Sequence, residues 1–463
     1  MSSEFCHKDG KRKGEGIPLE FPGSRFLTLL DNSFFDVTLS PMNNESSTLN
    51  QIALKYFKRN FFLGVVNGVL FNFAWAFVSG STVLPWFVSK LSNSNVLIGL
   101  ASTLESLGWF MPQLPVAVMT THHHKQMPLY TKTAYLRAFA FFLLTASVFI
   151  FGDKHPSWLL LSFFVFFSIY SLGGGLAGVA FTDIVAKTIP ANQRGSFFGM
   201  RMFFGGALAA LGGLIVKEIL ESHHFPVNFG IIFTIALIII LFGLFSFCGV
   251  KEPESNSYRE KKHWKENFLK GMNIFKENKK FKQLFMVRVF VGAYVLGYPF
   301  YVIFARKVLG ISAGTVGVFL TCEMSGYVLS NLLWGYLSNN VSNRLVLILS
   351  SFCSFVPPLV LLLNVSTPLP LFTFYLIFFF LGSTNAGLGL GATNYLLGFA
   401  PEEDRPIYIG FLHTLVGPTV FLSVIGGLIL QLTSFSFLYI LVLLTAILGI
   451  CFSFKLTELK TKT

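Results

Sequence analysis

Apolar stretches long enough to cross a lipid bilayer recur along the whole of this chain. A helix needs about 20 predominantly apolar residues to span about 30 Å of hydrocarbon. In lipid the backbone must satisfy its own hydrogen bonds, so such stretches have to form helices. The composition agrees, since 53% of the 463 residues are hydrophobic, 12% are charged and 55 are phenylalanine. The sequence therefore predicts an all-α polytopic membrane protein.

We predict twelve transmembrane helices, and the charges between them predict an orientation. The helices cover residues 61–84, 96–119, 133–151, 157–180, 198–219, 227–248, 284–305, 312–334, 345–363, 369–394, 408–431 and 435–454. When each cation is assigned to its nearer side, 30 of the 35 Lys and Arg residues fall on the side of the N-terminus. This positive-inside pattern predicts that both termini are cytoplasmic and that the protein lies in the cytoplasmic (inner) membrane. It also accounts for the net charge of +13 without a nucleic-acid partner.

The longest polar interior segment divides the predicted helices into six and six. We expect five regions: a disordered cytoplasmic N-terminal segment (1–55), an N-terminal six-helix bundle (56–248), a basic cytoplasmic linker (249–283), a C-terminal six-helix bundle (284–454) and a cytoplasmic tail (455–463). Within the linker, Phe268, Met272 and Phe275 have helical spacing beneath a basic face. This pattern is typical of a helix that lies on an anionic membrane surface.

Two internal matches relate the halves, as in many transporters. The first has a constant offset of 218 residues and pairs Gly99, Glu105 and Gly108 with Gly317, Glu323 and Gly326. The second has an offset of 211 residues and pairs Thr182, Asp183, Pro190, Arg194 and Gly199 with Thr393, Asn394, Pro401, Arg405 and Gly410. Two matches at corresponding places of a six-plus-six layout indicate an internal repeat.

With this layout the chain resembles the major facilitator superfamily of secondary transporters, over about residues 50–455. The best motif is "GYLSNNVSNR" at 335–344. Gly335 and Arg344 fit the family pattern, whereas Asn339 stands in place of the usual acid. The first-half copy, around "VMTTHHHKQ" at 118–126, departs from the pattern.

The resemblance implies two six-helix bundles around a central cavity that opens alternately to each side. The first, fourth, seventh and tenth spans would line it, and Asn72, Trp75, Ser79 and Thr82 have a spacing that puts them on one helix face. The candidate cavity-lining residues are Asn72, Trp75, Ser79, Tyr294, Tyr298, Tyr301, Asn385 and Asn394. Helix packing is the open alternative for each, because small and polar residues also mediate contacts between membrane helices.

Four charges inside the predicted spans are candidates for the mechanism: Glu105, Glu323, Arg288 and Asp183. An ionised group at mid-bilayer costs a few kcal/mol, so each glutamate is paired with a cation, is protonated and tolerated, or binds and releases a proton during transport. Arg288 is the best candidate partner. Asp183 and Lys187, one turn apart, can pair locally.

The repeated loops supply candidates for a cytoplasmic gate. Arg194 and Arg405 can cap helix C-termini or pair with acids such as Asp404 when that side is closed. The gate candidates are Arg194, Arg405, Gly335, Asn339 and Arg344.

The function that these features predict is secondary active transport of a small solute by alternating access. This transport can be coupled to protons. The alternatives are a facilitator or drug-type exporter without proton coupling, and a transporter-like receptor or scaffold that transports nothing. A neutral, zwitterionic or amphipathic solute fits slightly better than a multiply charged one. The chain has no Gly-rich phosphate loop with its Lys and Ser/Thr, which disfavours an ATP-driven pump. No nucleophile–base spacing stands out, so we expect no enzyme activity, no cofactor and no metal site. The expected partners are the solute, protons if coupled, and the lipid bilayer, with the chain a monomer.

Overall fold

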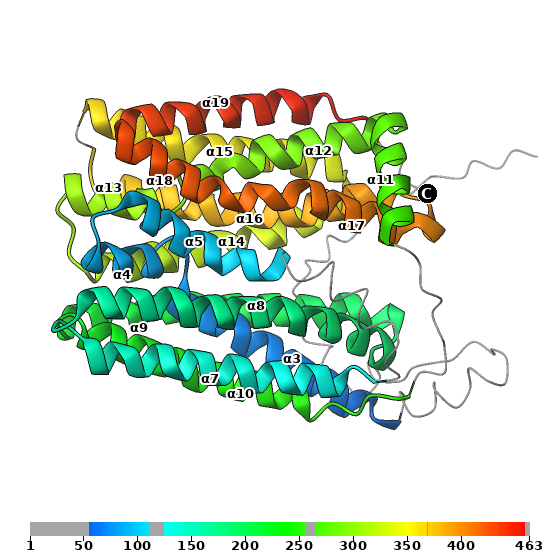
Figure 1. Cartoon of the computed structure of the whole chain (residues 1–463). Helices are drawn as coiled ribbons and strands as arrows, with labels where there is room; N and C mark the ends of the chain where they lie inside the picture. Colours follow the sequence, from blue (N-terminus) through cyan, green and yellow to red (C-terminus); the bar gives the residue numbers. More distant parts are fainter. Residues whose placement is uncertain (1–54, 111–124, 255–263, 368, 459–463) are drawn as a thin grey trace, which may run out of the picture. The chain divides into compact units, whose positions relative to one another are not determined.

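The computed structural model of the chain describes residues 55–110, 125–254, 264–367 and 369–458 (Figure 1). They belong to one compact unit and are almost wholly helical, without a strand among them. The N-terminal segment predicted to be disordered lies outside the described residues except for Lys55. Most of the first-half motif copy at 118–126 also lies outside them.

The long helices run side by side, and the linker helix α11 lies across their ends (Figure 1). In chain order the α-helices are α3 (Phe57–Trp75), α4 (Val83–Leu91), α5 (Asn95–Phe110), α7 (Met127–Phe151), α8 (Pro156–Thr188), α9 (Arg194–Ser222), α10 (Val227–Cys248), α11 (Trp264–Glu277), α12 (Lys279–Gly292), α13 (Phe300–Val308), α14 (Thr315–Asn340), α15 (Asn343–Ser366), α16 (Phe372–Phe399), α17 (Arg405–Val416), α18 (Leu422–Leu432) and α19 (Phe435–Phe454). Eleven helical segments of the described residues are long and apolar enough to cross a membrane. With α5, which is described only as far as Phe110, they agree with the predicted twelve-span layout.

Three of these segments are interrupted by short 3₁₀ turns. In the first, α3 is followed by η3 (Ala76–Val78) and an extended Ser79 (φ −60°, ψ 128°) before α4 begins. In the seventh, η5 (Ala293–Leu296) separates α12 from α13, and in the eleventh η7 (Gly417–Phe421) separates α17 from α18. The predicted spans over 61–84, 284–305 and 408–431 are present as Phe57–Leu91, Lys279–Val308 and Arg405–Leu432, and the structure adds that each contains a 3₁₀ turn. The first and seventh spans hold corresponding places in the two halves.

Helix pairs among the described residues that join the first half of the chain to the second include α5 with α18, α9 with α14, and α4 with α13 and α14. At glycine positions the backbones of the paired helices come into direct contact. A Cβ at Gly99 of α5 would overlap the Ser423 carbonyl of α18, and one at Gly317 of α14 would overlap the Gly213 carbonyl of α9. Small residues of this kind let membrane helices pack backbone to backbone.

The repeated residues occupy equivalent places in the two halves. Gly99 and Gly317 both lie where the halves meet. Gly108 packs on Ser171 of α8, the fourth span, and Gly326 packs on Phe379 of α16, the tenth span. Spans four and ten correspond in the repeat, so the first sequence match describes a real structural equivalence.

The second sequence match also corresponds to equivalent local structure. Pro190 precedes the 3₁₀ turn η4 (Ala191–Gln193), and α9 then begins at Arg194. Pro401 precedes η6 (Glu402–Asp404), and α17 then begins at Arg405.

The linker helix α11 is docked on α17. The Phe268 ring lies 5.6 Å from the Phe411 ring, and Lys270 Nζ forms an ion pair with Asp404 at 2.6 Å. Phe268 and Leu269 remain 42% and 63% exposed, which leaves apolar surface for the membrane contact that the sequence predicts. We call the ends of the spans near α11 the linker side. The start of α3 belongs to it, because Arg59 donates to the carbonyl of Gly249, directly after α10.

Candidate functional site

Buried hydroxyl groups gather at the break in the first span. Ser79, Ser81 and Thr82 are at most 2% exposed. The Oγ atoms of Ser79 and Ser81 are 2.8 Å apart, and Thr82 Oγ1 donates to Ser79 Oγ at 3.1 Å. Non-helical backbone at membrane depth is tolerated only inside protein or beside a water-filled cavity, and these hydroxyls make the break polar.

Glu323 of α14 lies against this break and is 1% exposed. Ser81 donates to its Oε2 at 2.5 Å, and the Tyr298 hydroxyl donates to its Oε1. Ser81 and Tyr298 each stand two residues before a short half-helix, α4 and α13 respectively. The N-terminal end of a helix favours a negative charge, so the two interrupted spans present donors and helix ends to one carboxylate.

Glu105 of α5 joins the same site from the first half of the chain. The backbone N–H of Gly80 donates to its carboxylate, and a Cβ at Gly80 would overlap that group. Its other oxygen, Oε1, is buried and makes no hydrogen bond to any described residue. Glu105 interacts electrostatically with Glu323. The structure therefore brings together the two acids that the repeat singled out.

Tyr294 connects the acid pair with Arg288. Its ring packs edge-on against Tyr298, with ring centroids 5.6 Å apart. Tyr294 interacts electrostatically with both glutamates and with Arg288, and Arg288 interacts with His413 of α17. Within the described ranges, no ion pair includes Glu105, Glu323 or Arg288. The alternative in which each acid is paired with a cation is therefore not what the structure shows.

The remaining cavity-lining candidates are dispersed. Asn72 donates to the carbonyls of Gly68 and Arg201, between α3 and α9, whereas Trp75 is 46% exposed. Together with the break at Ser79, this makes the prediction of one shared helix face in the first span wrong.

In the seventh span, Tyr301 turns away from Tyr294 and Tyr298. It is fully buried and packs on Tyr439, 4.6 Å between ring centroids. The expected three-tyrosine face is therefore wrong. In α16, Asn394 donates to Ser338 of α14 at 3.0 Å, and Asn385 is exposed.

The linker-side candidates make local contacts. Lys187 pairs with Asp183 at 2.5 Å, as predicted, and with the buried Glu252 at 2.9 Å. Arg194 donates to the carbonyls of Ala186 and Ile189 and so caps the end of α8.

The motif residues at the end of α14 and in the loop after it make separate contacts and share no common partner among the described residues. Arg344 pairs with Glu458 at 2.8 Å and donates to the Phe454 carbonyl. Asn339 is exposed, and nothing lies within 4 Å of a Cβ built at Gly335. Arg405 starts α17. Their role as gate residues stays a prediction.

Sequence reasoning missed several polar residues of the spans. Ser81 was not singled out, although the run Gly80-Ser81-Thr82 before Pro85 marks a possible break in an apolar stretch. Arg137 of α7 lies between the rings of Phe71 and Tyr170, 4.9 and 4.6 Å from their centroids.

Two other missed arginines bind backbone across helices. Arg201 of α9 donates to the carbonyl of Gly64 in α3. Arg306 of α13 donates to Ser89 of α4. The sequence feature that could have identified both arginines is a basic residue inside a predicted span or directly at its end.

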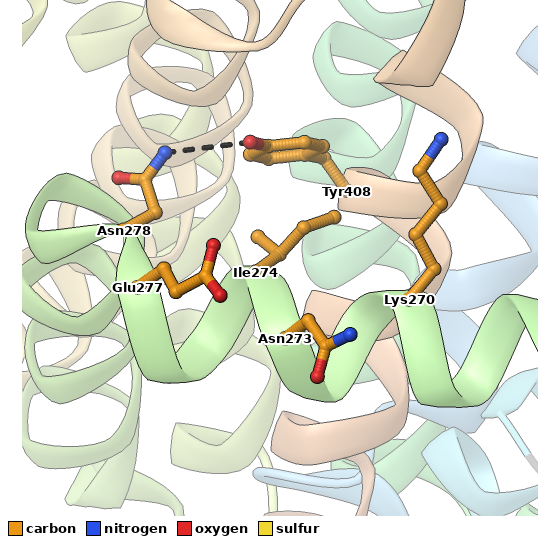
Figure 2. Close-up of a pocket in the computed structure, with 6 residues that line it drawn as sticks. All are labelled: Lys270, Asn273, Ile274, Glu277, Asn278 and Tyr408. Atoms are coloured by element: carbon orange, nitrogen blue, oxygen red, sulfur yellow. Dashed lines mark hydrogen bonds between the residues drawn. The ribbon is translucent and has the colours of Figure 1, made fainter.

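A pocket of about 390 Å³ lies on the linker side between α11 and α17 (Figure 2). It is lined by Lys270, Asn273, Ile274, Glu277, Asn278 and Tyr408. Asn278 Nδ2 donates to the Tyr408 hydroxyl at 3.4 Å. Because Lys270 is engaged by Asp404 and Asn278 by Tyr408, these polar groups serve to dock the linker helix.

Equivalent glycine contacts in two halves, with interrupted spans beside their meeting point, define a helical membrane-transporter fold. A family model described as Major Facilitator Superfamily matches residues 61–308 and 289–463. The chain therefore belongs to the major facilitator superfamily, as the sequence layout predicted. No curated protein sequence matches it significantly.

Solved structures of transporters share the fold at low sequence identity. A D-xylose–proton symporter is 15% identical, with a TM-score of 0.69 over 88% of this chain and 99% of its own. The nucleoside transporter NupG is 14% identical, with a TM-score of 0.63 over 86% and 99%. A POT family transporter in complex with 5-aminolevulinic acid is 13% identical, with a TM-score of 0.63 over 87% and 97%.

Proposed function

We propose that the chain is a secondary active transporter that moves a small solute by alternating access and couples its movement to protons through Glu105 and Glu323. One observation carries the proposal: acids from opposite halves of the chain meet beside the interrupted first and seventh spans. Discontinuous helices in corresponding positions of two repeats are a mark of transporter binding sites. Proton coupling in the D-xylose–proton symporter of the same fold is consistent with the proposal.

The energetics favour a proton as the coupled ion. An ionised carboxylate inside the bilayer costs a few kcal/mol, and a second one beside it adds repulsion. A bound proton removes both costs. The membrane potential supplies about 2.3 kcal/mol per charge per 100 mV, and about 1.4 kcal/mol corresponds to a tenfold gradient. One proton per solute therefore supports accumulation of nearly two decades per 100 mV.

Alternating access requires contacts that seal one side and then break. On the side opposite the linker, Arg306 of α13 donates to the Ser89 carbonyl of α4 at 2.8 Å. Its guanidinium lies 5.3 Å from the Trp86 ring centroid. We propose that this contact closes the non-cytoplasmic end, with the linker side cytoplasmic as the positive-inside pattern indicates.

The test is solute accumulation in proteoliposomes under an imposed pH gradient, with a metabolite panel that includes sugars, nucleosides and amino acids. We expect the gradient to drive accumulation in the unmodified protein. In the Glu105→Gln and Glu323→Gln variants, accumulation driven by the pH gradient should disappear, while solute exchange without a gradient persists. Glu218→Gln, at an exposed acid of α9, is the matched control.

The other outcomes separate the alternatives. Downhill solute flux that does not depend on the pH gradient, in the unmodified protein and in every variant, would identify a facilitator or an uncoupled exporter. Absence of flux for every solute under every gradient would contradict transport itself and would favour a receptor or scaffold.

A further inference from the structure

Three hydroxyl groups at the break in the first span form a hydrogen-bonded chain that ends on Glu323. Thr82 Oγ1 donates to Ser79 Oγ at 3.1 Å, and the Oγ atoms of Ser79 and Ser81 are 2.8 Å apart. Ser81 Oγ then donates to Glu323 Oε2 at 2.5 Å. All four residues are at most 2% exposed. We call Thr82, Ser79 and Ser81 the hydroxyl chain; it is continuous and shielded from solvent.

The hydrogen-bond partners also determine the direction of the hydroxyl chain. A hydroxyl group has one hydrogen to donate and two lone pairs with which to accept. The one hydrogen of Ser81 goes to Glu323, so Ser79 is the donor in the contact between Ser79 and Ser81. Ser79 Oγ itself accepts from Thr82 Oγ1 and from the backbone N–H of Ser81 at 3.3 Å. Every hydroxyl of the chain therefore points its hydrogen toward the carboxylate.

Helix capping does not account for this arrangement. Thr82 is the N-cap residue of α4, where a threonine oxygen usually accepts from the first helical turn, yet its side chain makes no such bond. Buried threonines elsewhere in the described spans donate to the backbone carbonyl four residues earlier, as is common in helices; examples are Thr133, Thr145 and Thr188. At the break the hydroxyl groups donate to one another instead.

We propose that Thr82, Ser79 and Ser81 relay the coupled proton to Glu323. The inference rests on the proposed proton coupling and names the residues that carry the proton to that site. A hydronium ion gives a proton to Thr82 Oγ1. The hydrogen of Thr82 passes to Ser79, that of Ser79 to Ser81, and that of Ser81 to the Glu323 carboxylate. Each hydroxyl loses one hydrogen and gains one, so the net step moves one proton from water to Glu323.

The position of Thr82 links the hydroxyl chain to alternating access. Thr82 directly precedes α4, whose other end is held to α13 by the contact of Ser89 with Arg306. Separation of these half-helices lets water approach Thr82 from the end opposite the linker. While they are in contact, Thr82 is 0% exposed, and the hydroxyl chain has no access to solvent. The same movement that opens this end therefore supplies the proton.

The test compares proton-driven uptake with solute exchange in proteoliposomes containing the full chain. The probe is the sugar, nucleoside or amino acid of the panel above that the unmodified protein accumulates. Net uptake requires Glu323 to gain and lose a proton in each cycle, whereas exchange between two solute pools does not. Thr82→Val keeps the shape of the side chain without its hydroxyl, and Ser79→Ala removes the middle member of the hydroxyl chain.

We expect both variants to slow proton-driven uptake at least about tenfold, because a positioned proton-transfer group typically contributes about 100-fold or more. Their rate of solute exchange should not change. Thr82→Ser retains a donor and should keep the uptake rate. Thr145→Val is the matched control, since the Thr145 hydroxyl is also buried but donates to the Phe141 carbonyl within α7. Melting temperature and a single size-exclusion peak establish that each variant is folded.

The other outcomes are decisive as well. Uptake by Thr82→Val and Ser79→Ala at the rate of the unmodified protein would overturn the relay and leave the proposed coupling intact. An equal loss of uptake and exchange would also overturn it, because that result would show that the hydroxyl chain only supports the structure. If the pH gradient drives no solute of the panel into liposomes with the unmodified protein, the proposed coupling itself fails, and the relay with it.

Discussion

At the scale of single residues, the site depends on which hydroxyl groups reach Glu323. Ser81 and Tyr298 both donate to it, whereas Tyr301, one helical turn further along, is fully buried with a hydroxyl that meets no described hydrogen-bond partner. The two tyrosines thus differ in what their hydroxyls touch, and their rings also pack on different neighbours, Tyr294 and Tyr439 respectively. We therefore propose that Tyr298 acts at the site and that Tyr301 serves packing.

The first prediction uses that pair of tyrosines. Tyr298→Phe keeps the ring and removes one donor from a buried carboxylate, which we expect to cost roughly tenfold or more in proton-driven uptake. Tyr301→Phe removes an unsatisfied buried hydroxyl and should leave uptake unchanged and the melting temperature equal or higher. Equal uptake by the Tyr298→Phe variant and the unmodified protein would contradict the role given to this hydroxyl.

Gly80 provides a second prediction at this scale. A methyl group there would overlap the Glu105 carboxylate, so Gly80→Ala should cost about 1–3 kcal/mol of stability through overpacking and should reduce uptake. Gly389→Ala is the control, because nothing lies within 4 Å of its Cβ position. Melting temperatures in detergent measure the difference, and a Gly80→Ala protein as stable as the control would show that the carboxylate lies elsewhere.

At the scale of helices, the interrupted first and seventh spans decide where the site lies. The sequence predicted the spans, because hydropathy reports length and burial in lipid. It did not predict the breaks, although Gly80-Ser81-Thr82 beside Ser79 and Gly297 and Pro299 beside Tyr298 are break signals, because hydropathy averaged over a whole span hides a short polar or Gly/Pro stretch. The position at which a helix is interrupted also depends on the groups that pack against it, here the Glu323 carboxylate. Such tertiary contacts cannot be deduced from the local sequence.

The contact between the half-helices α4 and α13 gives a prediction at this scale. Arg306→Gln removes a charged donor to Ser89, so the two half-helices should separate more often at the end opposite the linker. Spin labels at Leu91 and Leu309, beside the ends of α4 and α13, should report longer distances by pulsed electron paramagnetic resonance. Arg59→Gln removes a bond within the first half and should leave the distance unchanged. An unaltered distance distribution in Arg306→Gln would show that this contact does not hold the end closed.

At the scale of the whole molecule, the sequence predicted the fold well and the site in part. Apolar stretches of membrane-spanning length and the six-plus-six layout predicted the superfamily, and the offset of 218 residues placed Glu105 and Glu323 at equivalent points. Their meeting could not be deduced from spacing, since it needs both halves to pack through glycines such as Gly99 and Gly317. Pairing of the acids with a cation such as Arg288 was one of three alternatives that the sequence left open, because distances between spans are set by packing, and no ion pair among the described residues joins them.

Proton flux that accompanies solute movement tests the central claim most directly. Proteoliposomes containing a pH-sensitive dye receive a transported solute with no imposed gradient, and the internal pH is followed while solute uptake is measured. The account predicts a solute-dependent pH change with the unmodified protein. It also predicts that Glu323→Gln abolishes this change although solute exchange continues. A Glu323→Gln protein that moves as many protons per solute as the unmodified protein would contradict the account.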